Sequence, residues 1–161
     1  MPKESHLENL KKNYAKIQKK YNLPSFKEFN EEFHIEKAAE AETELLITEM
    51  RRFMGDKLSN YLRFIEAILN PANAPMFVFS FIKSIGAEEK KKLTDIYKKL
   101  AKIEVKLIEL DIEFSEKKEV EFIKESYKEW QDMKKELLII INEVKKNWDT
   151  KFEANSKGYF G

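Results

Sequence analysis

The sequence predicts an all-α fold, an antiparallel, coiled-coil-like helical bundle of three long helices with shorter N-terminal and Phe-rich helices. Neither glycine nor proline, the two poorest helix formers, occurs between Gly86 and Gly158. Within that stretch apolar residues recur at spacings of three and four, which places them in one stripe along a helix. The stripe comprises Leu93, Ile96, Leu100, Ile103, Leu107, Leu110 and Phe114.

Two short helices are predicted before the long ones. A serine followed three residues later by a glutamate is the signature of a capping box, and it occurs at Ser5 and again at Ser25. The first box predicts a helix over about 6–21, which Pro24 ends, and the second predicts a helix over about 26–33. The apolar face of the first helix comprises Leu7, Leu10, Tyr14 and Ile17.

The first long helix is expected over about 36–69, where Asn70 and Pro71 end it. Gly55 lies inside this helix and would allow a neighbouring helix to approach closely. Its apolar stripe comprises Ile47, Met50, Met54, Leu58, Tyr61, Ile65 and Ile68.

The least polar run of the chain, residues 76–82, follows a short proline-bounded linker. Its periodicity alone does not separate a buried strand from a buried helix. We expect a helix that ends near Gly86, because Pro75 suits a first helical turn and the chain offers no second strand to pair with. Three interpretations of its apolar side chains stay open: core at the end of the bundle, a surface for a protein partner, or contact with a membrane surface.

Residues 87–148 form either one bent helix or two helices. The apolar stripe meets Lys117 and Glu121 where it expects apolar residues, and Ser115 at the slip would cap a new helix. We favour a turn near 114–118, which would give three helices of roughly 28–34 residues, a match that suits an antiparallel bundle. The stripe resumes at Val120, Ile123, Tyr127, Trp130, Leu137, Ile141, Val144 and Trp148. A single rod would instead expose its apolar seam and favour self-association.

The predicted domain organisation is one helical bundle over 1–148 and a polar C-terminal tail over 149–161. The 161 residues are 42% hydrophobic and 37% charged, with 30 basic and 29 acidic side chains for a net charge of +1. A disordered chain would hold fewer large apolar residues. No apolar run reaches the ~20 residues of a membrane span, and no apolar signal region occurs at the start. We therefore expect a cytoplasmic protein, and note that abundant Lys and Glu without Cys is a thermophile-like bias.

Few residues are suited to catalysis or to binding a metal. A carboxylate-bridged metal site in a bundle needs Glu-x-x-His on two helices, and only Glu31 and His34 match, since Lys3 precedes the other histidine, His6. The chain has no Cys, and its four glycines do not form a phosphate-binding loop. We expect no metal, no cofactor and no enzymatic activity.

The leading functional interpretation is a non-catalytic interaction or scaffold protein that binds a protein partner or itself. The predicted contact residues are the exposed members of the 76–82 run and two tail aromatics: Met76, Phe77, Phe79, Phe81, Ile82, Tyr159 and Phe160. The alternative is an RNA or ribonucleoprotein binder, because basic helix faces can line a phosphate backbone. Its residues would be Lys11, Lys12, Lys16, Lys19, Lys20, Lys90, Lys91, Lys92, Lys98 and Lys99. Many of these lysines could also be plain solvated helix faces.

Three segments carry a resemblance: Leu23-Pro24-Ser25-Phe26 with Phe29-Asn30, residues 75–85, and the final Asn155-Ser156-Lys157-Gly158-Tyr159-Phe160-Gly161. With these segments the chain resembles, over most of its length, small all-helical archaeal proteins of unassigned function. The resemblance implies an archaeal, cytoplasmic, helical protein and no particular activity.

Overall fold

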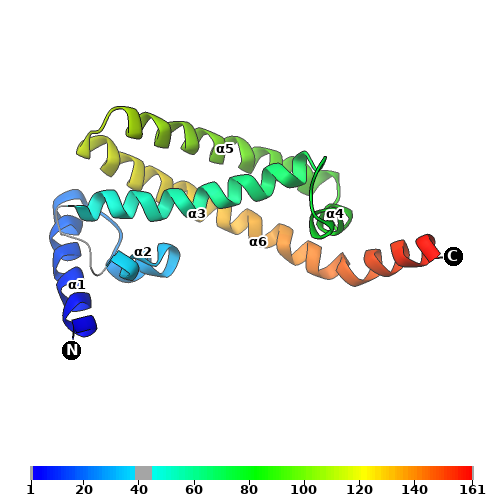
Figure 1. The fold of residues 1–161 in the computed structure, drawn as a ribbon, viewed down its shortest axis with the longest axis horizontal. Helices are drawn as coiled ribbons and strands as arrows, with labels where there is room; N and C mark the ends of the chain where they lie inside the picture. Colours follow the sequence, from blue (N-terminus) through cyan, green and yellow to red (C-terminus); the bar gives the residue numbers. More distant parts are fainter. Residues whose placement is uncertain (1, 39–44, 161) are drawn as a thin grey trace. The chain divides into compact units, whose positions relative to one another are not determined.

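The chain is all-α. The computed structural model describes residues 2–38 and 45–160, and within these ranges it contains no strand (Figure 1). The elements are α1 (Pro2–Tyr21), α2 (Phe26–Phe33), a 3₁₀ turn η1 (Ile35–Ala38), α3 (Leu46–Leu69), α4 (Met76–Lys83), α5 (Ala87–Ile112) and α6 (Glu116–Phe160). The predicted helical-bundle class is confirmed.

The structure divides into two compact units. The first comprises Met1–Leu58 and Glu104–Tyr127, and the second comprises Ser59–Ile103 and Lys128–Gly161. The helices α3, α5 and α6 each run through both units, whereas α1 and α2 belong to the first and α4 to the second.

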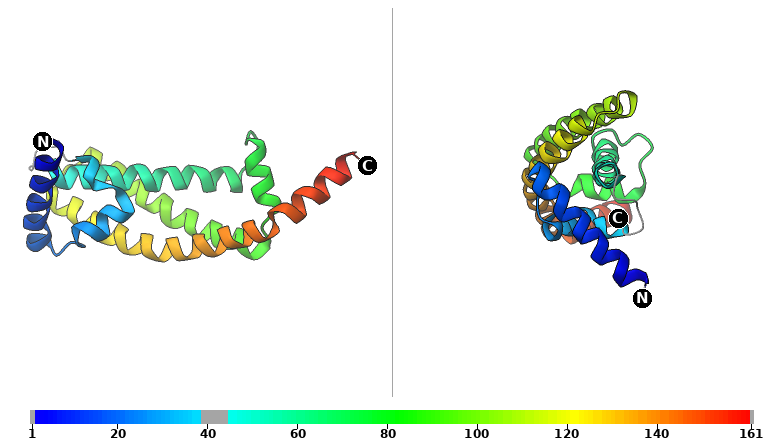
Figure 2. Two further views of the ribbon diagram at one scale, coloured as in Figure 1. Left: turned by 90° about the horizontal axis from the view of Figure 1, so that it is seen from below. Right: turned by 90° about the vertical axis from the view of Figure 1, so that its left-hand side faces the viewer.

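In the first unit α2 forms where its capping box predicts. The Ser25 hydroxyl accepts from the Glu28 amide at 3.1 Å, and the Ser25 amide donates to the Glu28 carboxylate at 3.1 Å. The helix α1 lies across the beginning of α3 rather than along it (Figure 2). Tyr14 is fully buried and donates its hydroxyl to the Pro24 carbonyl at 2.8 Å, so the loop after α1 is held against the core.

Contacts in the first unit show the relative direction of α3 and α5. Gly55 of α3 lies against Leu107 of α5, and Arg51, one turn earlier in α3, lies against Asp111, one turn later in α5. The two segments are therefore antiparallel. The expected break is confirmed, because α5 ends at Ile112 and α6 begins at Glu116, with the Ser115 hydroxyl accepting from the Lys118 amide at 3.4 Å.

In the second unit α4 is a helix, as expected, and packs through aromatic rings. The Phe81 ring meets the Phe64 ring of α3 edge to face at 5.4 Å, and the Phe77 ring lies 5.8 Å from the Trp148 ring of α6. The side-chain amide of Asn147 donates to the Ser84 carbonyl at 3.3 Å just beyond α4.

Three boundaries differ from the expectations. The helix α1 begins at Pro2 rather than near residue 6, so Ser5 lies inside the helix and not before it. Within the predicted helix over 36–69, the structure has η1 and then α3 from Leu46, and residues 39–44 lie outside the described part. The long helices hold 24, 26 and 45 residues rather than 28–34 each. The helices α3 and α5 are shorter than expected because α3 begins at Leu46 and α5 ends at Ile112, and α6 is longer because it continues through the expected tail to Phe160. Neither glycine nor proline occurs in α6 before Gly158.

The apolar stripes also differ at two places. Phe114 was expected in the buried stripe of α5 but is exposed, because it follows the last residue of that helix. Ile141 was expected in the stripe of α6, but Ile140 is fully buried and Ile141 is exposed. Residues 138–141 are all apolar, so the sequence does not indicate which of them faces inward.

Candidate functional site

The helix α4 has one buried and one exposed apolar face. Val78 and Phe81 point into the core of the second unit, whereas Met76, Phe77 and Phe79 are exposed. The exposed Met76 and Phe79 are three positions apart and so share one side of the helix. This outer face of α4 is the part of the predicted contact set that the structure presents to solvent.

The prediction that Phe81 contacts a partner is wrong, because the structure places it in the core. It is only 3% exposed, and its ring packs against Phe64. Ile82 is half-buried, and the side chains of Tyr159 and Phe160 lie outside the described residues, although both positions belong to α6.

The side of α4 opposite Met76 and Phe79 is packed against the rest of the second unit. The Ser84 hydroxyl donates to the Ser80 carbonyl at 2.9 Å and closes the last turn of the helix. The Phe77 ring lies 6.5 Å from Phe64 and 5.8 Å from Trp148, so one edge of it is anchored while the rest faces solvent. The helix that carries Met76 and Phe79 is therefore packed on its other side and hydrogen-bonded at its end.

The lysines of α1 form a one-sided basic surface in the first unit. All five predicted residues, Lys11, Lys12, Lys16, Lys19 and Lys20, are exposed. Four of them are spaced by four, three and one residues, which places them on the side away from the buried Leu10 and Tyr14. We call Lys12, Lys16, Lys19 and Lys20 the α1 lysine face.

The second predicted lysine group belongs to the other unit. Lys90, Lys91, Lys98 and Lys99 of α5 are exposed, and Lys92 is half-buried.

A cavity of about 490 Å³ lies in the first unit beside the end of α1. Its lining comprises Lys20, Tyr21, Asn22, Glu116, Lys117, Val120, Glu121 and Lys124. The Tyr21 hydroxyl donates to the Glu116 carboxylate at 2.9 Å, and a hydrogen bond with Tyr21 raises the pKa of Lys20 above its ordinary value. Three lysines are thus offset by two glutamates.

A buried ionic network that the sequence analysis missed lies between the helices of the first unit. The Glu119 side chain is only 1% exposed and accepts from Arg51 Nε at 2.7 Å and from the Thr48 hydroxyl at 3.1 Å. Arg51 also donates to Asp111 at 3.1 Å. Burial lowers the pKa of Arg51, but its hydrogen bonds to both carboxylates outweigh that effect and raise it. The signal in the sequence is that Glu119 lies on the side of α6 that carries buried Phe122 and Ile123.

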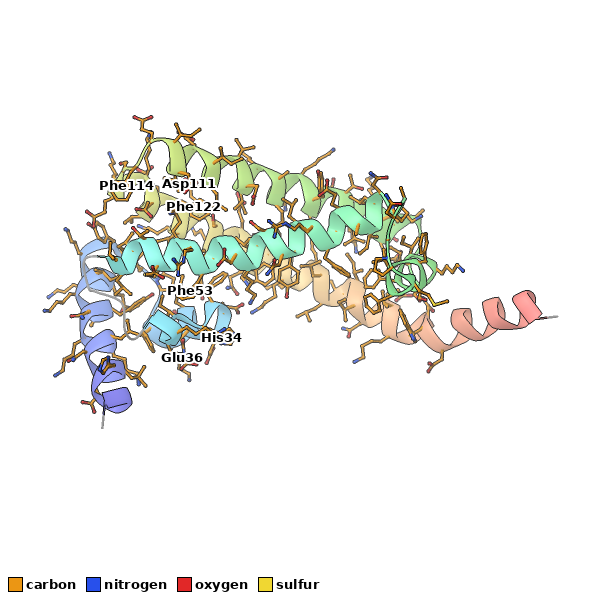
Figure 3. All side chains as sticks on the ribbon, in the orientation of Figure 1. His34, Glu36, Phe53, Asp111, Phe114 and Phe122 are labelled. Carbon is orange, nitrogen blue, oxygen red and sulfur yellow. The ribbon has the colours of Figure 1, made fainter. Side chains whose placement is uncertain are left out.

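The described residues show no preformed metal site and no membrane span. Among them no group of three or more His, Asp or Glu side chains is close enough to hold a metal ion. His34, labelled in Figure 3, is an exposed residue that caps α2 with a left-handed backbone (φ 53°). None of the helices, over the part of the chain that is described, combines the length and apolar content that crossing a bilayer requires.

Two further groups of apolar side chains are exposed. On α5 and the turn after it they are Val105, Ile108, Ile112 and Phe114, and on α6 they are Leu138, Ile139 and Ile141. The sequence analysis named only Phe114 and Ile141 among them, and it expected both in a buried stripe, because the exposed residues are interleaved with residues of that stripe.

Comparisons of the chain with protein-family models, with curated proteins and with solved structures found no match. The function is therefore inferred from the surfaces themselves.

Proposed function

We propose that this chain is a non-catalytic interaction protein that binds another protein through the outer face of α4. The observation that carries the proposal is the pair Met76 and Phe79, which stand in solvent on a helix whose opposite face is already packed. Burying a large apolar side chain is worth about 1.5–3 kcal/mol, and grouped exposed apolar residues mark interaction sites.

The core does not need these two side chains. Val78, Phe81 and Ile85 fill the interior side of this segment, and Phe77 is held by Phe64 and Trp148. A partner that covers Met76 and Phe79 therefore requires no rearrangement of the helix. Such preorganisation lowers the entropic cost of binding.

The test is capture of partners from native lysate with the tagged full chain, treated with nuclease. We expect the double variant Met76→Asp/Phe79→Asp to lose a nuclease-resistant protein partner while its far-ultraviolet circular dichroism stays unchanged. The matched control is Leu138→Asp, which places the same charge at an exposed apolar position of α6 in the same unit. Retention of the same partner proteins by the α4 double variant would overturn the proposal.

Phe81→Asp separates the contact face from the core. Because Phe81 is buried against Phe64, a carboxylate there is left without a partner in an apolar environment. We expect this variant to lose helicity or to unfold at lower temperature, unlike the variants at Met76 and Phe79.

The α1 lysine face supports a second candidate, RNA or ribonucleoprotein binding. Its four lysines are exposed on one side of a helix, an arrangement that can follow a phosphate backbone. Binding to a single-stranded RNA oligonucleotide should weaken with salt, with a slope near −0.7 for each phosphate neutralised. Replacing the four lysines with glutamine should flatten that slope, whereas Lys145→Gln/Lys146→Gln, at exposed positions of the other unit outside the candidate set, should not. A flat response of the unmodified chain would exclude this function.

A further inference from the structure

The end of α5 and the turn after it carry an exposed apolar surface that the fold does not use. Val105, Ile108 and Ile112 are spaced by three and four residues, so they form one stripe on the helix, and Phe114 continues the exposed apolar residues in the turn. We call these four residues the hairpin surface. Figure 3 labels Phe114 in this turn and Asp111 on α5 beside it.

The exposure of these side chains is high. Ile112 is 81% exposed and Phe114 is 68% exposed, whereas Leu110, between them and Ile108, is buried in the first unit. The opposite side of α5 therefore already contributes to the core. Three large apolar side chains in solvent along one stripe, with a fourth in the turn that follows the helix, are the kind of feature that marks a docking surface.

Carboxylates outnumber basic side chains along the hairpin surface. Residues 104–118 contain five acidic side chains, Glu104, Glu109, Asp111, Glu113 and Glu116, and three basic side chains, Lys106, Lys117 and Lys118. Glu109 and Glu113 share one cation, Lys118, at 3.7 Å each. Asp111 meets Arg51, which also holds the buried Glu119. Each of these two cations is shared by two carboxylates, so the carboxylates beside the apolar stripe are only partly balanced.

The carboxylates beside the hairpin surface indicate which kind of partner can bind there. A second copy of the same surface would bring two acidic rims together in an isologous contact, which is unfavourable. The basic helix α1 of a second copy offers no free apolar face, because Leu10 and Tyr14 are buried in its own unit. A membrane surface rich in anionic lipid would repel the carboxylates.

We propose that the hairpin surface binds a basic amphipathic helix of another protein. Apolar side chains of that helix at spacings of three and four would pack on Val105, Ile108 and Ile112. Lysines or arginines beside them would meet the carboxylates of Glu109 and Glu113, which gives the contact its charge selectivity. The hairpin surface lies in the first unit and α4 in the second, so this inference does not depend on the function proposed for α4.

The test measures binding of a fluorescent synthetic peptide to the full chain by anisotropy. The probe is a helical peptide with leucine at positions i, i+3 and i+7 and lysine at the flanking positions, and its counterpart carries glutamate in place of lysine. We expect the lysine peptide to bind and the glutamate peptide to bind at least about tenfold more weakly. The affinity for the lysine peptide should fall with rising salt.

Variants of the chain locate the contact. Ile108→Ser/Ile112→Ser should weaken binding of the lysine peptide by about tenfold or more, and Glu109→Gln/Glu113→Gln should remove the preference for lysine over glutamate. The matched control is Leu138→Ser, because Leu138 is 54% exposed and Ile108 is 53% exposed. Both Leu138→Ser and Met76→Asp/Phe79→Asp should bind the peptide as the unmodified chain does, which keeps this test separate from that of α4.

Several outcomes would overturn the proposal. Failure of the lysine peptide to bind, or equal binding of both peptides, would remove the charge argument. Unchanged binding by Ile108→Ser/Ile112→Ser would place the peptide elsewhere. A dimer of the free chain in sedimentation equilibrium that Ile108→Ser/Ile112→Ser dissociates would show that a second copy covers the surface.

Discussion

Glu119 brings a negative charge into the interior of the first unit, and Arg51 is the cation that balances it. Arg51 Nε lies 2.7 Å from the carboxylate, and the Thr48 hydroxyl donates to it at 3.1 Å. The pair offsets a desolvation cost of several kcal/mol for each ion, so its net contribution to stability is small. Removing only one member of the pair costs much more stability, because the remaining charge stays buried without its partner.

We expect Arg51→Met to lower the free energy of unfolding by about 3–5 kcal/mol, because it leaves the Glu119 carboxylate without its cation. Urea denaturation followed by circular dichroism measures the change. The control is Arg52→Met, since Arg52 is exposed and pairs with Glu49 at 3.2 Å on the helix surface. Its loss should cost less than about 1 kcal/mol.

A second substitution tests the cause. Adding Glu119→Leu to Arg51→Met removes the orphaned charge, so it should recover most of the lost stability. Equal losses for Arg51→Met and Arg52→Met would mean that the Glu119 carboxylate does not depend on Arg51.

Tyr14 couples the stability of the first unit to alkaline pH. Burial, with smaller contributions from Tyr127 and Glu28, raises the pKa of its hydroxyl well above the ordinary value of 10.0. Above about pH 10 the unfolded chain releases this proton while the folded chain retains it. The free energy of unfolding therefore falls as the pH rises through that range, by up to about 1.4 kcal/mol for each pH unit.

Replacing Tyr14 with phenylalanine should make this fall shallower. At about pH 8 the variant should be less stable by about 1 kcal/mol, because it loses the hydrogen bond to the Pro24 carbonyl. Between about pH 8 and pH 11 it should lose less stability than the unmodified chain does. Urea denaturation at both pH values measures the difference, and parallel losses would contradict the prediction.

Among the elements, α3 and α5 approach each other closely at Gly55. A Cβ atom there would lie 3.2 Å from both Cδ carbons of Leu107, which is tighter than ordinary van der Waals contact. The glycine costs helix propensity, about 1 kcal/mol relative to alanine, and in return allows this approach.

We expect Gly55→Ala to change the free energy of unfolding by less than about 1 kcal/mol, because the gain in propensity is offset by crowding at Leu107. Gly55→Leu should cost about 1–3 kcal/mol, since its side chain does not fit between the helices. The control Asn60→Leu, at an exposed position of the same helix, should fall within about 0.5 kcal/mol of the unmodified chain. If both leucine variants were equally stable, the close approach would not constrain the pair.

For the molecule as a whole, two features favour association: the net charge is only +1, and several large apolar side chains are exposed. The charges balance at about pH 7.8, where little repulsion keeps molecules apart. Ile112, Phe114 and Met76 then offer sites for association.

Solubility should therefore be lowest near pH 7.8. We expect Ile112→Lys to raise it more than Asn142→Lys, because both add one positive charge but only the first removes an exposed apolar side chain. Precipitation by polyethylene glycol at that pH measures both variants. An equal gain would mean that charge alone limits solubility.

The sequence alone predicts much of the local structure. The capping box at Ser25 predicts α2, and the slip of the apolar stripe with Ser115 predicts the break between α5 and α6. The same capping pattern at Ser5 is misleading, because α1 begins at Pro2. Such features depend on hydrogen bonds and side-chain spacing within a few residues, which are visible in the chain itself. The helical class follows in the same way from the absence of glycine and proline over 87–157.

Tertiary structure alone decides which apolar residues face solvent. Phe79 and Phe81 belong to the same short run, yet Phe81 packs on Phe64 and Phe79 is exposed. The exposure of Ile112, and the charge of Glu119 inside the first unit, also depend on which helices lie opposite them. Spacing along a helix places residues on a common face, but burial requires a neighbour, and neighbours come from segments distant in the chain. Nearby residues in the sequence therefore determine where helices form. The candidate binding surfaces of this protein arise only when those helices pack against one another.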